Sequence, residues 1–361
     1  MSAPTAALSD DPRIRAAIGH WAPRLIANGI DYNDFVTTTS RIASWSEWCH
    51  EWAQTAAKHE RLAREAEQRG SLISAADAYV RAALCHHFGK FVFFDDMEQH
   101  RRADAATHGN YRKAIAHLDP PADRVSIPYG KTALPGYLRR PPGVTRPPVA
   151  LIVCGLDSVK EEMNSFEPLF HRRSIATLTI DGPGQGESEA LPIEPEFEKV
   201  MSAVLDWLEK RSDVDGRRVA AVGVSLGGYY VARAAAFEKR LRGAVPVGGP
   251  YDFGAHFDHV PSLTQEAFHI RSHSPDLAAA KKAAARLDLT GVAEKIAIPM
   301  LVIFGRQDRL IPPAQAERLF HEIASPDKQL AMYPDGNHVV NNMPWAWRPL
   351  AADWMRERLA R

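Results

Sequence analysis

Ser225 lies in a Gly-x-Ser-x-Gly pentapeptide, Gly223 to Gly227, which follows an apolar run and precedes a helical pattern. A serine hydroxyl is a weak nucleophile at neutral pH, so it needs a base within hydrogen-bond reach and an acid that orients this base. In a strand-to-helix turn of this kind, the hydroxyl stands clear of the sheet and the next backbone N–H faces the same space. The pentapeptide therefore predicts a nucleophile. The alternative interpretation is a glycine-rich turn without chemistry.

Two downstream residues supply the base and the acid that this serine would need. Asp308 follows one predicted strand, and His338 follows the next. Because the carboxyl ends of parallel strands meet at one edge of a sheet, we expect Ser225, Asp308 and His338 to converge there. The chain order Ser, Asp, His is that of α/β-hydrolases. Asp335 competes with Asp308 for the role of the acid, but it lies too near the histidine in sequence to be its usual partner.

Acyl transfer from such a serine also needs N–H donors that face the developing oxyanion. The Leu226 N–H comes directly after the nucleophile and is the first donor expected. The second donor is expected in the turn that follows the predicted strand 149–153. We assign it to the Leu156 N–H, with Asp157 as the alternative.

From residue 124 onward, short apolar strands alternate with helices, a pattern typical of a parallel sheet with helices on both faces. A mainly helical insertion interrupts this alternation at about 251–298. The expected strands are 124–128, 133–139, 149–153, 175–180, 218–224, 243–247, 300–305 and 329–333. The expected helices of this part are 159–172, 196–211, 226–238 and 345–359.

The first 122 residues contain only helical patterns. Trp45, Trp48 and Trp52 recur at helical spacing, with charged residues on the opposite face. Asp119, Pro120 and Pro121 end this region. The chain is therefore expected to consist of an all-helical domain, 1–122, and an α/β domain, 123–361.

Two segments carry a resemblance to a known family. Residues Gly155 to Glu162 and Asp181 to Glu187 resemble the 2,6-dihydropseudooxynicotine hydrolase group of α/β-hydrolases. Fungal polyketide-shortening hydrolases of pigment pathways have similar segments. The resemblance implies that residues 1–122 form a cap domain over an α/β-hydrolase core, and that the protein forms homodimers. It also implies cleavage of a carbon–carbon bond next to a carbonyl.

The nicotine-pathway member of this group uses an extra acidic side chain near its nucleophile. Asp252, Asp258 and Glu266 are the candidates in the corresponding region of this sequence. The resemblance does not choose among them.

Composition limits the partners of the protein. Lys plus Arg and Asp plus Glu number 44 each, so no overall field attracts nucleic acid or an anionic membrane. We expect a small, largely apolar or aromatic substrate instead. Residues Met1 to Arg13 lack a signal-peptide pattern, and no segment is long and apolar enough to span a bilayer, so a cytoplasmic location is expected. The three cysteines, Cys49, Cys85 and Cys154, are expected to be free thiols.

Two other patterns suggest cofactors but fit them poorly. Asp181 to Gly186 is glycine-rich but lacks the Lys-Ser/Thr ending of a phosphate-binding loop. Cys85, His86 and His87 are adjacent on a predicted helix and therefore point in different directions, which does not suit a metal. No cofactor and no metal are expected.

These observations favour a serine hydrolase that acts on a carbonyl substrate. Carbon–carbon cleavage of a β-diketone-like or acyl-aromatic small molecule is the first expectation. A carboxylesterase, or a thioesterase or acyltransferase of secondary metabolism, is the alternative within the same chemistry. A non-catalytic binding protein on a hydrolase scaffold is the alternative outside it.

Overall fold

The computed structural model describes residues 10–360, which divide into a unit that ends at Pro121 and a unit that begins at Ala122. Part of the N-terminal segment in which no signal peptide was expected, residues 1–9, lies outside the described residues. Between residues 10 and 360, no helix has both the length and the apolar character that a bilayer crossing requires.

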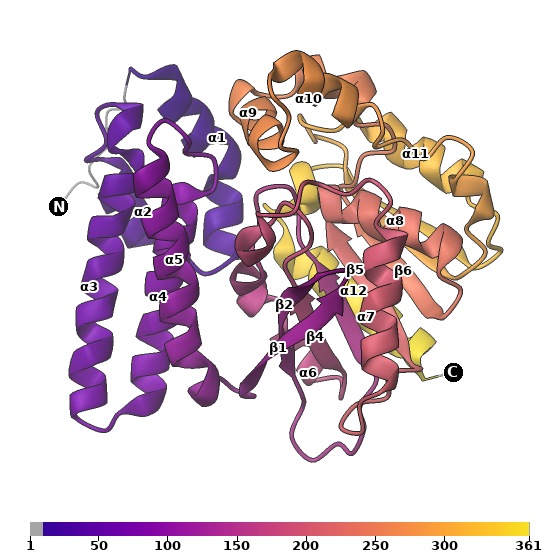
Figure 1. Ribbon diagram of the computed structural model, residues 1–361, viewed down its shortest axis with the longest axis horizontal. Coiled ribbons are helices and arrows are strands. Elements are labelled where there is room, and N and C mark those ends of the chain that lie inside the picture. Colours follow the sequence, from indigo (N-terminus) through magenta and orange to yellow (C-terminus); the bar gives the residue numbers. More distant parts are fainter. Residues whose placement is uncertain (1–9, 361) are drawn as a thin grey trace. The chain divides into compact units, whose positions relative to one another are not determined.

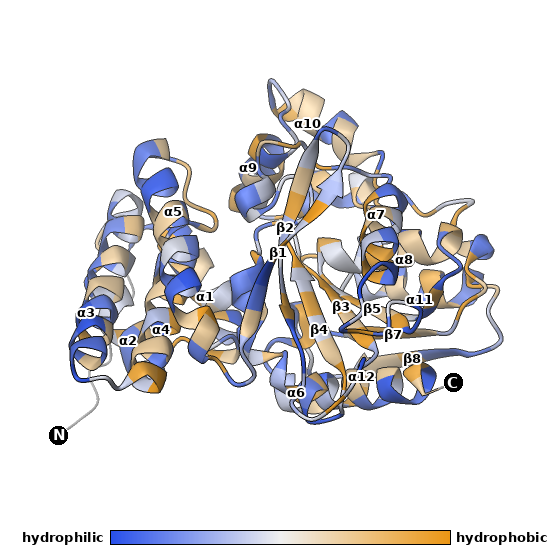
Figure 2. Cartoon of the chain, turned by 60° about the horizontal axis from the view of Figure 1, so that its bottom comes forward, coloured by the Kyte–Doolittle hydropathy of each residue, from blue (hydrophilic) through white to orange (hydrophobic). Residues whose placement is uncertain are grey.

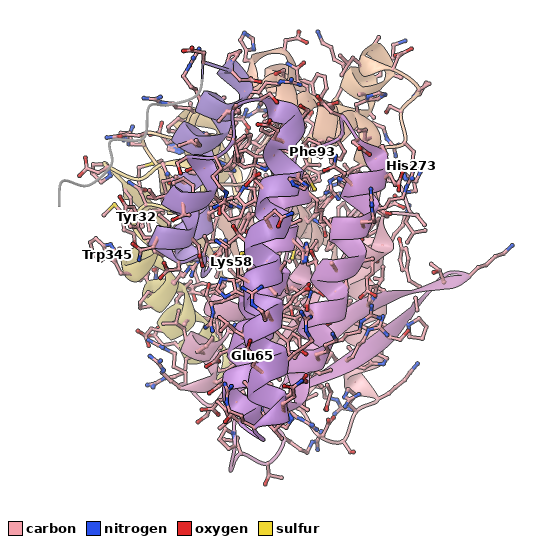
Figure 3. The ribbon with its side chains drawn as sticks, turned by 90° about the vertical axis from the view of Figure 1, so that its left-hand side faces the viewer. Tyr32, Lys58, Glu65, Phe93, His273 and Trp345 are labelled. Carbon is pink, nitrogen blue, oxygen red and sulfur yellow. The ribbon has the colours of Figure 1, made fainter. Side chains whose placement is uncertain are left out.

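The first unit is all helical. Its three longest helices, α3 to α5, lie side by side (Figures 1 and 3), and exposed Lys58 and Glu65 lie along α3. Trp48 and Trp52 are buried on the opposite side of that helix. The helices are α1 (Pro12–Ala27), α2 (Tyr32–Thr39), α3 (Trp48–Gln68), α4 (Leu72–Lys90) and α5 (Met97–Ala114), with 3-10 turns η1 (Trp45–Glu47) and η2 (Ile115–His117). The all-helical character predicted for this region is confirmed, although α2 was not predicted.

The second unit is built on one eight-stranded sheet with the order β1-β2-β4-β3-β5-β6-β7-β8. The strands are β1 (Ala122–Tyr129), β2 (Thr132–Arg139), β3 (Val149–Val153), β4 (Ala176–Ile180), β5 (Val219–Val224), β6 (Leu241–Val247), β7 (Met300–Gly305) and β8 (Lys328–Tyr333). Strands β1 and β2 pair antiparallel, as do β2 and β4, and all other pairs are parallel. The sheet is mixed and mostly parallel, so the predicted fold class is confirmed.

Helices cover both faces of this sheet (Figure 1). Helix α8 (Leu226–Phe237) packs on β5 and β6 from one side, next to α7 (Glu198–Glu209). Helix α12 (Pro344–Leu359) packs on the same strands through Trp354 and Met355, together with α6 (Pro168–His171). The strands between these layers are largely apolar (Figure 2) and buried on both faces. After β6 come η5 (Gly254–His259), α9 (Ser262–Arg271), α10 (Leu277–Ala284) and η6 (Ala293–Lys295), and α11 (Pro313–Glu322) lies between β7 and β8.

The helix predicted over 159–172 is wrong as a single element. The chain forms a 3-10 segment, η3 (Lys160–Ser165), and then the short α6. The Lys160 backbone N–H donates to the Asp181 carboxylate at 2.8 Å, and its ammonium reaches the same group at 2.6 Å. Lys160, Glu161 and Glu162 are all buried here, so the segment lacks the exposed polar face of an amphipathic helix.

His171, at the end of α6, is a buried histidine whose protonation should affect the stability of the protein. Its Nε2 lies 2.9 Å from the Thr177 hydroxyl. Burial, with a contribution from the nearby Arg139 guanidinium, lowers the pKa of His171 to about 3. The unfolded chain therefore binds a proton at this residue below its ordinary pKa of about 6.5, whereas the folded chain does not. We expect this residue to lower the free energy of unfolding by about 3 kcal/mol between pH 7 and pH 4.

The variant His171→Gln, which keeps a polar partner for Thr177, should lose less of its unfolding free energy over the same pH range. Urea titrations of both proteins at pH 7, 5.5 and 4 measure the difference. Parallel pH profiles of the two proteins would contradict the assignment.

Candidate active site

Ser225 lies between β5 and α8 with φ 55° and ψ −123°, a conformation rare for a residue with a side chain. The flanking glycines allow this turn. A Cβ on Gly223 would lie 2.0 Å from the carbonyl oxygen of Gly227, and a Cβ on Gly227 would lie 2.4 Å from that of Val153. The turn therefore brings strand β5, helix α8 and the end of β3 so close that only glycine fits at either position.

His338 follows strand β8 and begins the 3-10 turn η7 (His338–Val340). Its Nε2 lies 2.9 Å from the Ser225 Oγ. The next two residues, Val339 and Val340, have φ values of 59° and 52°. A β-branched residue with such a backbone is strained by on the order of 1–3 kcal/mol, and surrounding packing must hold it. Val339 lies against Gly248, where an added Cβ would come within 2.9 Å of the Val339 nitrogen.

Asp308 follows strand β7, and its Oδ2 lies 2.7 Å from the Nδ1 of His338. Its other oxygen, Oδ1, accepts the backbone N–H groups of Leu310 and Ile311 at 2.8 and 3.0 Å. The Asp308 side chain is completely buried, so these three groups satisfy a carboxylate that water cannot reach. Asp335, the competing acid, is exposed to solvent. The structure thus places Asp308, and not Asp335, against the histidine.

This geometry defines what the three side chains can do. An ionised Asp308 carboxylate can only accept a hydrogen bond from the histidine Nδ1, so the neutral histidine carries its proton on that nitrogen. The Nε2 atom is then left with a lone pair that accepts the Ser225 hydroxyl. The arrangement can remove the serine proton and can stabilise the imidazolium that results.

The two predicted oxyanion donors lie next to this serine. The Leu226 N–H begins helix α8, and the Leu156 N–H lies in the turn after β3, which also contains Asp157. Within residues 10–360, neither leucine N–H has a hydrogen-bond acceptor. Gly155 lies so close that an added Cβ would be 3.1 Å from the Ser225 Cβ. Both amides are therefore available to a substrate oxygen.

The three candidate accessory acids have different surroundings. The carboxylate of Asp252 accepts the Ala255 N–H at 3.0 Å. Asp258 is exposed and forms an ion pair with Lys281 at 2.5 Å. Neither carboxylate forms a hydrogen bond with Ser225 or His338 in the described part of the chain. Glu266 is half-buried on α9.

The glycine-rich loop from Asp181 to Gly186 is filled by contacts between groups of the protein itself. Asp181 is fully buried and pairs with Lys160, whose ammonium also lies 2.8 Å from Glu187 and 3.0 Å from Glu161. Burial alone would lower the pKa of Lys160, but the adjacent Asp181 and Glu161 carboxylates raise it well above its ordinary value. The sequence interpretation missed this cluster. The only sign of the cluster in the sequence is the high density of charged residues beside apolar strands.

Cys85, His86 and His87, which fit a metal poorly as a sequence pattern, lie on helix α4 of the first unit. Burial raises the pKa of the Cys85 thiol, and the His86 Nε2 lies 3.0 Å from Glu60. The cysteines at 49, 85 and 154 are all free and buried.

Two family models match the chain. The model described as Esterase FrsA-like matches residues 31–265, and that of the prolyl oligopeptidase family matches residues 195–360. The first match covers more than half of the chain and extends across both units.

Individual proteins show the same relationship. The 2,6-dihydropseudooxynicotine hydrolase of Paenarthrobacter nicotinovorans is 32% identical over 338 residues, which is 93% of this chain and 91% of that protein. A crystal structure of 2,6-dihydroxy-pseudo-oxynicotine hydrolase superposes with a TM-score of 0.86 at 31% identity, covering 94% of this chain and 95% of the other. The hydrolase pyiE of Pyricularia grisea is 33% identical over 238 residues, which is 58% of this chain and 50% of that protein.

Proposed function

We propose, because the chain belongs to the FrsA-like family of α/β-hydrolases, that it is a serine hydrolase with Ser225 as its nucleophile. The observation that supports this most directly is the continuous hydrogen-bonded row Asp308–His338–Ser225, with distances of 2.7 and 2.9 Å. In the proposed reaction, His338 accepts the Ser225 proton while the hydroxyl oxygen attacks a substrate carbonyl. The N–H groups of Leu226 and Leu156 stabilise the oxyanion.

We further propose that the bond cleaved is a carbon–carbon bond next to this carbonyl. The similarity to the 2,6-dihydropseudooxynicotine hydrolase, which extends over 93% of the chain, supports this choice. With a 1,3-diketone, the tetrahedral intermediate collapses to an acyl-enzyme and an enolate, and His338 returns its proton to the enolate. Water, activated by His338, then releases a carboxylic acid, so that one diketone and one water give one acid and one ketone.

A carboxylesterase is the second candidate, favoured by the match to the Esterase FrsA-like model. The same residues serve it, with an alkoxide in place of the enolate as the leaving group. The cap role of residues 1–122, the independence from cofactors, the homodimer and the cytoplasmic location stay predictions.

Two measurements separate the candidates. A fluorophosphonate should label the protein stoichiometrically, at Ser225 by peptide mapping, and labelling should be lost in His338→Ala. A panel of 1,3-diketones, acyl-phenols and aryl esters should then show release of an acid and a ketone from at least one diketone, or of an acid and a phenol from at least one acyl-phenol. Turnover of esters alone would favour the carboxylesterase, and the absence of labelling would indicate a binding protein.

A further inference from the structure

Gln185 connects two loops at the carboxyl edge of the sheet. Its side-chain Nε2 donates to the carbonyl oxygens of Cys154 and Gly155, at 2.9 and 2.5 Å. Its Oε1 accepts the backbone N–H of Gly182 at 2.9 Å. The side chain is buried, with 1% of its surface exposed. One amide therefore joins the loop after β3, which carries the proposed oxyanion donor Leu156, to the loop after β4.

The Gly155 carbonyl accepts the Gln185 amide and, at the longer distance of 3.4 Å, the Ser158 N–H, and these bonds determine where the Leu156 N–H points. These two groups belong to one planar trans peptide, in which C=O and N–H point in opposite directions. A carbonyl held against Gln185 therefore directs the Leu156 N–H away from Gln185. If this peptide rotated, the N–H would be replaced by a carbonyl oxygen, which repels an oxyanion.

Residue 155 makes such a rotation easy unless something opposes it. The close approach to Ser225 and to the Val224 carbonyl, 3.1 Å each from an added Cβ, favours glycine here. Glycine has no Cβ to restrict its backbone, so the peptide that follows it is unusually free to turn. Close packing therefore favours a residue with a flexible backbone, although the proposed oxyanion site needs the Leu156 N–H in one fixed orientation.

Gln185 is itself held in one orientation. The Gly182 N–H can only donate, so Oε1 must face it and Nε2 must face the two carbonyls. The loop around it is anchored by the buried pair of Asp181 with Lys160, and Asp181 also accepts the Glu187 N–H at 3.1 Å. We infer that Gln185 is a positioning residue, which fixes the Gly155–Leu156 peptide so that the Leu156 N–H faces the oxyanion. The inference rests on the proposed serine chemistry.

The test is the second-order rate constant for labelling of Ser225 by a fluorophosphonate, whose phosphoryl oxygen occupies the oxyanion position, so no natural substrate is needed. In Gln185→Met, which keeps the length of the side chain but removes its donor, we expect this constant to fall about 10- to 100-fold. In Gln185→Glu, which keeps an acceptor for the Gly182 N–H, we expect the labelling rate constant to fall by a similar factor. With an aryl ester, kcat should fall while KM stays unchanged.

Gln315 offers a matched control. It is also a buried glutamine, and its amide accepts the Tyr251 N–H at 2.7 Å and donates to the Asp252 carbonyl at 3.0 Å. Gln315→Met should lower the melting temperature comparably and leave the labelling rate within about twofold of the wild type. Labelling of both Gln185 variants at the wild-type rate would overturn the inference and leave the proposed function intact. A wild-type protein that does not react would overturn the proposed function, and the inference with it.

Discussion

Replacing Ser225 by alanine is expected to lower kcat by on the order of 10⁵- to 10⁶-fold, the loss typical of removing the nucleophile from a serine triad. The hydroxyl oxygen is the atom that would attack the substrate, and the His338 lone pair 2.9 Å away would then have no proton to accept. Alanine keeps the Cβ and adds no atom, so the turn at φ 55° should form as before. Steady-state rates with an aryl ester or a 1,3-diketone measure the loss.

The fold of this variant should be unchanged, with a melting temperature within about 2 °C of the wild type, because only one partly buried hydrogen bond is removed. Residual kcat above about 1% of the wild type, in protein free of wild-type enzyme, would be incompatible with Ser225 as the nucleophile.

Replacing Asp308 by asparagine should have the second-largest effect, about a 10⁴-fold loss of kcat. The N–H groups of Leu310 and Ile311 both donate to Oδ1, so they require an oxygen at that position. The asparagine must therefore turn its NH₂ group toward His338 Nδ1, which can meet it only with a lone pair. The proton then moves to Nε2, where it opposes the Ser225 hydroxyl, and the histidine no longer acts as a base.

Asp335→Asn is the matched control for this substitution. Asp335 precedes the same histidine by three residues, but it is exposed. Its replacement should leave kcat within about twofold, since it changes only a solvated charge. If Asp335→Asn and Asp308→Asn lost activity equally, Asp308 would not be the orienting acid.

Much of the fold follows from local patterns in the sequence. The strands at 149–153 and 300–305 have the predicted bounds, because short apolar runs with glycine or proline beside them leave little choice of register. Ser225, Asp308 and His338 each follow such a strand. The rule that carboxyl ends of parallel strands share one edge was therefore enough to predict that they meet.

The parts that sequence could not predict depend on contacts between distant residues. Lys160, Glu161 and Glu162 have the composition of an exposed first helical turn, yet all three are buried. Lys160 is buried against Asp181, 21 residues along the chain, and Glu161 lies 3.0 Å from the same ammonium. The proposed role of Gln185 likewise depends on a contact with a residue 30 positions away, which a periodic sequence pattern cannot predict.

The strained turn after His338 bears on how long a preparation of this protein stays useful. Val339 and Val340 hold left-handed backbone conformations only while their surroundings keep them there. A rearrangement confined to these two buried residues would leave the sheet beneath them folded, and it would move the imidazole away from Ser225. On storage or gentle warming, we expect turnover to decline while circular dichroism and light scattering still report an intact protein. The shelf life of the enzyme should therefore be judged by its activity rather than by its shape.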